Sequence, residues 1–150
     1  MIAAYRGTGY NVVLFLHVLT AFVAFAPAFV HPLLGNQVKS LEPGAKASVL
    51  GMIAGNGRRI YAPALILTGL FGFAMQGMSD GVIEFDQTWF WLAIVVWLAM
   101  NGVLHAVLLP AERATAAGDD SAESRVTAGG AVLTVLLLVM LYLMVFQPGL

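Results

Sequence analysis

The sequence of 150 residues has no cysteine and little charge, with seven basic and eight acidic residues. The absence of cysteine excludes disulfides, thiolate metal sites and cysteine nucleophiles, so any redox chemistry needs a cofactor or a metal. Charged residues make up only 10% of the chain and hydrophobic residues 60%, whereas soluble domains carry roughly 25% charged residues. A net charge of −1 gives no electrostatic basis for binding nucleic acid. The composition therefore indicates a single-domain integral membrane protein.

Four apolar runs are each about as long as the roughly 20 residues that cross a bilayer as a helix. Because the linkers are short, we expect an all-α fold, an up-down-up-down bundle of four membrane-spanning helices. Ala24-Phe25-Ala26 resembles a signal-peptide cleavage site, but Pro27 follows it, so we expect the first run to be retained as a span. None of the runs contains an acidic residue, which disfavours an ion pump. The predicted spans are 10–34, 60–78, 89–109 and 126–146.

The linkers and one span contain local structural signals. Residues 45–54 mix polar and apolar side chains and predict a short amphipathic helix on the membrane surface, which Gly55-Asn56-Gly57 should end. Asp120 and Glu123 have the spacing of a capping box and predict the start of the fourth helix. Gly69 and Gly72 give the second span a face of small residues, which favours close helix packing.

Basic residues are concentrated at one end of the predicted bundle. Six of the seven lie in the linkers after the first and third spans, and the seventh is Arg6. By the positive-inside rule, both termini are outside and the two linkers are in the cytoplasm of a bacterium, with the spans in its inner membrane. Trp89 and Trp91 then belong to an aromatic belt at the outer interface. The six basic residues are Lys39, Lys46, Arg58, Arg59, Arg113 and Arg125.

All three histidines lie within the apolar runs or at their ends. His17 lies inside the first span, where an ionisable side chain is costly unless it has a partner, a ligand or a proton to handle. At about 1.5 Å per residue, His17 and His105 differ by roughly 15 Å in depth, so we do not expect them to share one haem. His31 and His105 lie at similar depth and could be close. Without a ligand, we expect Thr20 or Gln76 to be the hydrogen-bond partner of His17.

Methionines lie at the depth of His17. Met75 and Met78 end the second span, and Met140 and Met144 lie in the same half of the fourth. Histidine with methionine can form the axial pair of a haem or a soft Cu(I) site. The alternative interpretation is that these methionines fill the core.

A second candidate site lies toward the cytoplasmic end. Asn101 is one turn from His105, and Tyr61 lies at comparable depth with Arg58 and Arg59. The two guanidinium groups could bind the propionates of a tetrapyrrole, or they could anchor the helix to lipid phosphates. For Asn101 and His105, the simpler interpretation is a hydrogen bond between the two side chains. For His31, the simpler interpretation is a position at the membrane interface, beside Pro32.

A set of short motifs spread over most of the chain forms a recognisable outline. Its residues are Leu16-His17, Pro32, Arg58-Arg59-Ile60-Tyr61, Pro63, Thr68, His105 and Val145-Phe146-Gln147-Pro148. This outline resembles the HemJ-type protoporphyrinogen oxidases. It is also similar to a family of four-helix bacterial membrane proteins of unknown function and, more loosely, to the CopD copper-transport family.

The resemblance implies a small bundle that binds haem b, with His17 and His105 at the positions of the family's two histidines. Arg58 and Arg59 would match its basic pair. It leaves the oxidase activity open, because the arginine that the family tends to have after Pro32 is missing here. Three functions are therefore expected as alternatives: a haem b protein with a redox or tetrapyrrole role, a cofactor-free accessory subunit of a larger membrane complex such as a respiratory one, and a copper-handling protein. The expected partners are the lipid bilayer and either a larger complex or a homo-oligomer.

Overall fold

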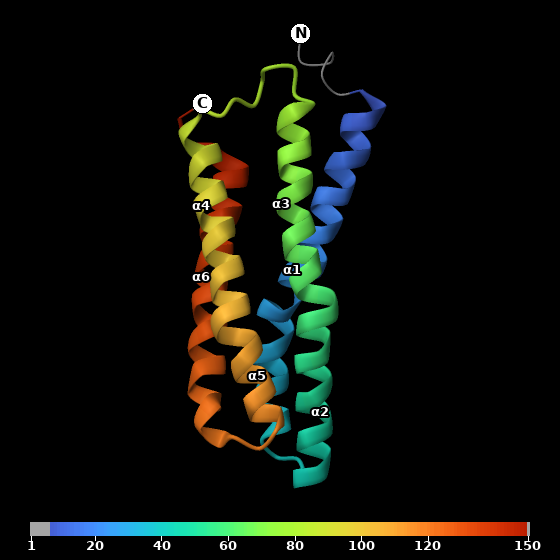
Figure 1. Ribbon diagram of the computed structural model, residues 1–150, viewed down its shortest axis with the longest axis vertical. Coiled ribbons are helices and arrows are strands. Elements are labelled where there is room, and N and C mark those ends of the chain that lie inside the picture. Colours follow the sequence, from blue (N-terminus) through green and yellow to red (C-terminus); the bar gives the residue numbers. More distant parts are fainter. Residues whose placement is uncertain (1–6, 150) are drawn as a thin grey trace.

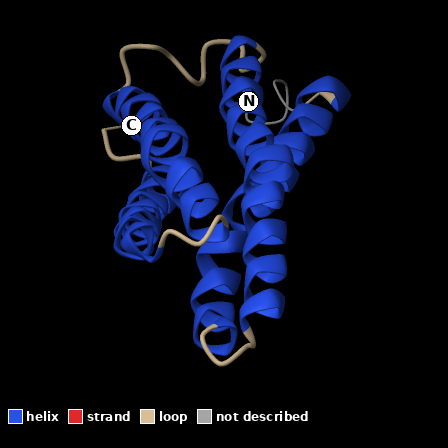
Figure 2. Ribbon diagram, turned by 60° about the horizontal axis from the view of Figure 1, so that its bottom comes forward, coloured by secondary structure: helices blue, strands red, loops and turns tan. Residues whose placement is uncertain are grey.

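Helices make up almost all of the chain in the computed structural model, which describes residues 7–149. Every regular element in that range is helical (Figures 1 and 2), which confirms the predicted all-α bundle. The basic residue Arg6 lies outside the described residues. In chain order the elements are α1 (Thr8–Val38), α2 (Pro43–Asn56), η1 (Gly57–Tyr61), α3 (Ala62–Gly77), α4 (Thr88–Val103), η2 (Leu104–Leu108), α5 (Leu109–Ala116), η3 (Asp120–Ala122) and α6 (Glu123–Phe146).

Within residues 7–149, four continuous helical segments are long and apolar enough to cross a membrane, which fits a multi-pass membrane protein. They alternate in direction (Figure 1). The start of α1, the connection 78–87 and the end of α6 lie at the end drawn uppermost in Figure 1, hereafter the upper end. The connections 39–42 and 117–119 lie at the opposite, lower end. The four segments are Thr8–Gly35, Pro43–Gly77, Thr88–Ala116 and Asp120–Phe146.

The second segment is longer than predicted. The helix expected at 45–54 is present, but the break expected at Gly55-Asn56-Gly57 is absent, and α2 continues through η1 into α3. A glycine inside a helix costs about 1 kcal/mol relative to alanine, and packing offsets this cost here. The segment containing α2 packs against α5 at the lower end, and a Cβ at Gly57 would lie 3.0 Å from the Leu109 side chain.

Two π-helical turns occur in the long segments, and each precedes a proline. The turn η1 ends at Tyr61, two residues before Pro63, and η2 ends at Leu108, two residues before Pro110. A proline lacks the N–H that would bond to the carbonyl four residues back, and its ring crowds that carbonyl. Across each turn a backbone N–H bonds instead to the carbonyl five residues back, which keeps the helix continuous. Turns of this kind are frequent at functional sites.

The fourth segment begins at Asp120 as predicted, but its cap is the preceding residue. The Asp119 carboxylate accepts a hydrogen bond from the backbone N–H of Ser121 at 3.0 Å and another from the Ser121 hydroxyl. These two bonds hold the pKa of Asp119 below its ordinary value, and the bond from the Ser121 hydroxyl has the larger effect. The capping-box spacing therefore predicted where the helix starts. It pointed to Asp120 as the capping residue, whereas the cap is Asp119.

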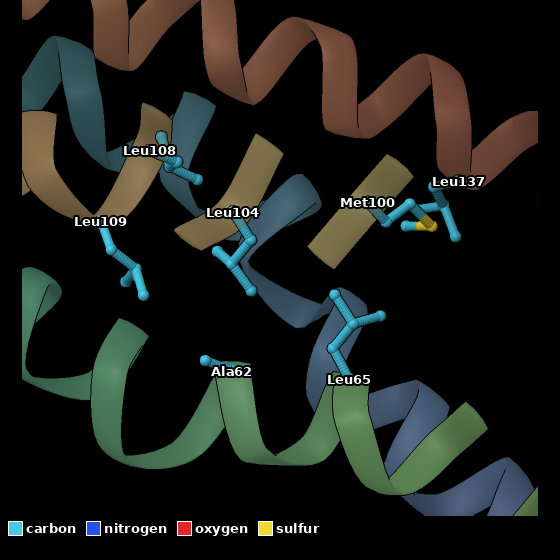
Figure 3. Close-up of a cluster of buried hydrophobic side chains, with 7 residues drawn as sticks. All are labelled: Ala62, Leu65, Met100, Leu104, Leu108, Leu109 and Leu137. Atoms are coloured by element: carbon cyan, nitrogen blue, oxygen red, sulfur yellow. The ribbon is translucent and has the colours of Figure 1, made fainter. Parts of the chain in front are cut away.

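Two clusters of buried side chains hold the helices together. The larger joins α3 to α4, η2, α5 and α6 (Figure 3), and the smaller joins α4 to α6 nearer the upper end. Helix α1 packs mainly on α3 and only lightly on α6. The bundle thus consists of two hairpins, α1 with α2–α3 and α4–α5 with α6, and the seam between α1 and α6 is weakly packed. The clusters are Ala62, Leu65, Met100, Leu104, Leu108, Leu109 and Leu137, and Trp89, Phe90, Ala93 and Leu143.

Candidate functional site

A cavity of about 530 Å³ lies between the two hairpins in the lower half of the bundle. Its upper part is lined by the buried apolar side chains of Leu65, Met100 and Leu137, and its lower part by polar and charged ones. A volume of this size lies within the range of roughly 300–1,000 Å³ that small-molecule sites occupy. The ionisable side chains of the lining are His31, Lys39, Lys46, Tyr61, Glu112 and Glu123.

Glu112 is the deeply buried acid of this cavity, with only 5% of the residue exposed. Its Oε1 lies 3.8 Å from Nδ1 of His31. Its Oε2 is buried without a hydrogen-bond partner and lies against Gly57, where a Cβ would come within 2.9 Å of it. Among the described residues, neither carboxyl oxygen receives a hydrogen bond, although an unsatisfied buried polar group costs about 1–3 kcal/mol. The carboxyl group therefore has unused acceptor capacity.

His31 and Tyr61 lie beside Glu112. The His31 ring from α1 packs edge-on against the Tyr61 ring from η1, with the ring centroids 6.2 Å apart. Since Glu112 belongs to α5, three helical segments contribute to this group. His31 faces Glu112, whereas His105 is exposed on η2 and does not line the cavity, so the proximity of the two histidines stays a prediction.

Two ion pairs lie at the lower margin of the cavity. Lys39 Nζ is 3.3 Å from Glu123 Oε1, and Lys46 Nζ is 3.9 Å from Asp120 Oδ1. Each pair connects the first hairpin to the start of the fourth segment. Both lysines of the lining therefore have an acidic partner, whereas Glu112 has no lysine or arginine within ion-pair distance in the described part of the chain.

The cavity reaches the surface along the seam between α1 and α6. The lining residues Pro32 and Gly35 of α1 and Thr127 and Ala131 of α6 are exposed or partly exposed. Direct packing between these two helices is limited. In a bundle that spans a membrane, an opening between two neighbouring helices lies on the side of the molecule, where the lipid is.

His17 lies in the upper half, against a second and smaller cavity of about 120 Å³. Its Nδ1 lies 2.8 Å from the backbone carbonyl oxygen of Thr68. Because a carbonyl only accepts hydrogen bonds, Nδ1 is the protonated nitrogen in this contact. The prediction of Thr20 or Gln76 as the partner was wrong. The Thr20 hydroxyl donates to backbone carbonyls of its own helix, and the Gln76 amide donates to the backbone carbonyl of Ile83.

Glycines on α3 allow both neighbouring helices to reach its backbone. Trp97 of α4 donates its indole N–H to the Leu65 carbonyl at 2.8 Å. A Cβ at Gly69 would lie 2.2 Å from the Trp97 ring, and one at Gly72 would lie 3.4 Å from the His17 ring. This geometry confirms that the small face of the second span permits close packing.

The structure separates the methionines predicted to join His17. Met140 and Met144 of α6 line the same small cavity as His17, whereas Met75 and Met78 do not. The Met78 methyl carbon instead lies 3.1 Å from where a Cβ of Gly9 would be, about 12 Å along α1 from His17. Among the described residues, no group of three or more His, Cys, Asp or Glu side chains could hold a metal ion.

The cavity beside His17 matches haem b in its donor chemistry and not in its size. The donor chemistry fits, because a histidine that binds a metal through one nitrogen usually donates its other N–H to a carbonyl or carboxylate. The space does not fit, because about 120 Å³ is less than half of the roughly 300 Å³ at which small-molecule sites begin. The arrangement of side chains around His17 therefore does not accommodate a tetrapyrrole.

The remaining predicted site residues do not form one group. Arg58 and Arg59 are exposed on η1, and His105 is exposed on η2. The Asn101 amide donates to the carbonyl four residues earlier at 2.9 Å, and its Oδ1 is buried without a partner, so the expected bond to His105 is absent. Of this set, Tyr61 alone lines the large cavity.

Glu112 was missed because the third span was expected to end at residue 109, before Pro110, a residue that often follows a helix end. The signal that could have found it is periodicity. Leu104, Leu108 and Glu112 recur at four-residue intervals, and all three are buried on one side of the third segment. Helical periodicity that continues past a proline indicates that the helix continues too.

No family model, no curated protein and no solved structure matches this chain. The resemblance to the HemJ-type oxidases therefore stays a prediction, and the candidate site rests on geometry.

Proposed function

We propose that this multi-pass membrane protein binds an amphiphilic small molecule in the cavity between its two hairpins. The observation that carries the proposal is the buried Glu112 carboxyl group, which receives no hydrogen bond from the described residues and lies in the wall of a cavity of about 530 Å³. Small-molecule sites combine a mostly apolar wall with a few convergent polar groups. Ionisable side chains in membrane-spanning segments are typically functional.

The depth of the cavity supports an amphiphile. If Trp91, which is exposed in the first turn of α4, marks one interface, then a hydrocarbon layer of roughly 20 residues ends near residues 30, 58, 110 and 126 of the four segments. Leu65 and Leu137 then line the cavity within the hydrocarbon, while His31 and Glu112 lie at the interface. An apolar body would occupy the upper part and a polar head the lower part.

The side opening supports entry from the bilayer. The exposed lining residues of the seam between α1 and α6, Pro32, Gly35, Thr127 and Ala131, lie near the interface end of the hydrocarbon layer and carry no charge. An amphiphile held at the headgroup level of the bilayer therefore meets the opening directly. Gly130 faces open space within the lining. A Cβ at this position would have no heavy atom within 4 Å, so a larger side chain has room to start from the cavity wall.

The test is equilibrium binding of radiolabelled dodecanol to the protein in nanodiscs, with the uptake of empty nanodiscs subtracted. We expect saturable binding that Gly130→Leu weakens about tenfold or more, since loss of about 1.4 kcal/mol is a factor of ten. Gly102→Leu is the matched control, because Gly102 also faces open space but does not line the cavity. Binding that does not saturate, or that the two variants affect equally, would contradict the proposal.

Copper handling is a second candidate, favoured by the set of soft donors around His17. With Nδ1 committed to a carbonyl, Nε2 is the nitrogen available to a metal, and two methionines line the same cavity. Histidine and thioether ligands suit Cu(I). The test is elemental analysis after anaerobic loading with Cu(I): the pair Met140→Leu and Met144→Leu should lose copper, and the pair Met75→Leu and Met78→Leu should retain it. Equal copper in both double variants removes this candidate.

A further inference from the structure

We propose that the ligand of the large cavity carries a cationic ammonium head, which Glu112 binds beside His31 and Tyr61. The inference rests on the proposed function, since it assigns a chemical class to the same ligand. The size of the cavity does not specify the charge of the ligand's polar head, and this inference does.

The distribution of charge in the lining favours a cation. Lys39 and Lys46 are each paired with an acid at the lower margin, so their charges are compensated. Glu112 lies deeper and has only His31 within ion-pair distance among the described residues, at 3.8 Å. An anionic head beside Glu112 would find no unpaired lysine or arginine among the described lining residues, whereas a cationic head would stabilise the ionised form of the carboxyl group.

The hydrogen bonding of Glu112 also favours an ammonium group. Its carboxyl oxygens receive no hydrogen bond from the described chain, and an ammonium group offers several N–H donors to such acceptors. Charge-assisted hydrogen bonds of this kind are about twice as strong as neutral ones. The Tyr61 ring, which packs against His31 in the same part of the lining, adds a face that attracts cations.

An organic cation fits better than a metal ion. The described residues have no cluster of three or more metal-ligating His, Asp or Glu side chains. Glu112 instead adjoins an apolar volume that leads up to Leu65, Met100 and Leu137. An ammonium group attached to a hydrocarbon body would use both parts of the cavity at once.

Two sources could supply this chemistry: a membrane lipid with an amine head, or a free amphiphilic amine dissolved in the bilayer. Both would reach Glu112 through the opening between α1 and α6. The experiment separates them by changing the lipid that surrounds the protein.

The experiment compares dodecylamine with dodecanol, which has the same chain and a neutral head, on the protein in phosphatidylcholine nanodiscs. Binding is measured at neutral pH after subtraction of the uptake by empty nanodiscs. We expect the wild-type protein to bind dodecylamine about tenfold to a hundredfold more tightly than dodecanol. Glu112→Gln keeps the shape of the side chain and removes its charge, and it should abolish this preference while leaving dodecanol binding intact.

The matched control is Glu42→Gln, because Glu42 is an exposed acid in the connection at the lower end and does not line the cavity. This variant should keep the preference for dodecylamine. Repeating the titration in phosphatidylethanolamine nanodiscs identifies the source: weaker dodecylamine binding there supports a lipid amine as the natural ligand, and unchanged binding supports a free amine.

Equal binding of the amine and the alcohol by the wild-type protein overturns the inference and leaves the proposed function standing. Binding of neither compound overturns both. A preference for the amine that survives in Glu112→Gln overturns the assignment to Glu112. The wild-type comparison needs no variant, so it decides the question even if Glu112→Gln does not fold.

Discussion

Replacing Gly69 with alanine should destabilise the bundle, although alanine is the better helix former. Gly69 lies in the middle of α3, where Trp97 of α4 crosses it closely enough for its indole N–H to reach the Leu65 carbonyl at 2.8 Å. A methyl group at Gly69 would lie 2.2 Å from one carbon of the Trp97 ring and 2.5 Å from two more ring atoms. An indole ring is rigid, so it has to move as a whole.

Three terms decide the size of this effect. The change from glycine to alanine stabilises a helix interior by about 1 kcal/mol. Overpacking of a well-packed contact costs typically 1–3 kcal/mol. Displacing the ring also lengthens the bond from Trp97 to Leu65, and hydrogen bonds between membrane helices contribute about 0.6 kcal/mol on average and up to about 1.7. The overlap at Gly69 is severe, so we expect the upper part of these ranges and a net loss of about 2–4 kcal/mol.

The assay is reversible unfolding of the purified protein in mixed micelles with increasing sodium dodecyl sulfate, followed by circular dichroism. Gly102→Ala is the control, since Gly102 is also inside a helix but a methyl group there would have no atom within 4 Å; it should be neutral or gain up to about 1 kcal/mol. In a Gly69→Ala, Trp97→Phe double variant the costs should be less than additive, because both changes act on one contact. If Gly69→Ala is as stable as Gly102→Ala, the close approach of α3 and α4 is incorrect.

Three further predictions use the same unfolding assay. His17→Phe should lower stability by about 0.6–1.7 kcal/mol, because it removes the bond to the Thr68 carbonyl; an unchanged midpoint would show that the bond contributes nothing. Asn101→Leu should be neutral or stabilising, because it removes a buried oxygen that has no partner; a loss above about 1 kcal/mol would reveal a partner for that oxygen. Lys39→Gln and Lys46→Gln should each lower the free energy of unfolding by less than about 1 kcal/mol, since their ion pairs are partly exposed. A larger loss of stability that disappears at high salt would show that the ion pair is stronger than its exposure indicates.

The number, the order and the alternating arrangement of the spanning helices could be predicted from the sequence, because apolar length is a local property that composition reveals directly. The ends of the helices could not. The span expected at 60–78 belongs to a helix that starts at Pro43, and its continuation through Gly57 depends on packing against Leu109 and Glu112 of another segment. Contacts between residues more than 50 positions apart leave no local signal in the chain.

The candidate site was predictable only in part, for the same reason. The sequence identified His17 as a side chain that needs a partner, but the partner is the main-chain carbonyl of Thr68, and every residue carries such a group. Tyr61 was among the predicted site residues, and it lines the large cavity. Glu112 fell in a predicted linker, because Pro110 is typical of a helix end, whereas here it follows a π turn within a continuous helix.

Glu112 and Gly57 together bear on whether this bundle is a packing scaffold or a binding protein. A buried carboxyl group without a hydrogen bond lowers stability, and so does a glycine inside a helix. The two features adjoin here, since the absence of a side chain at Gly57 makes room for Glu112 Oε2. A structural subunit would be more stable with an apolar side chain at residue 112, which would need no hydrogen bond. A binding protein needs an acceptor that the fold itself leaves unsatisfied, since an acceptor already bonded within the protein has less to offer a ligand. The arrangement therefore favours a ligand-binding cavity over a cofactor-free accessory role.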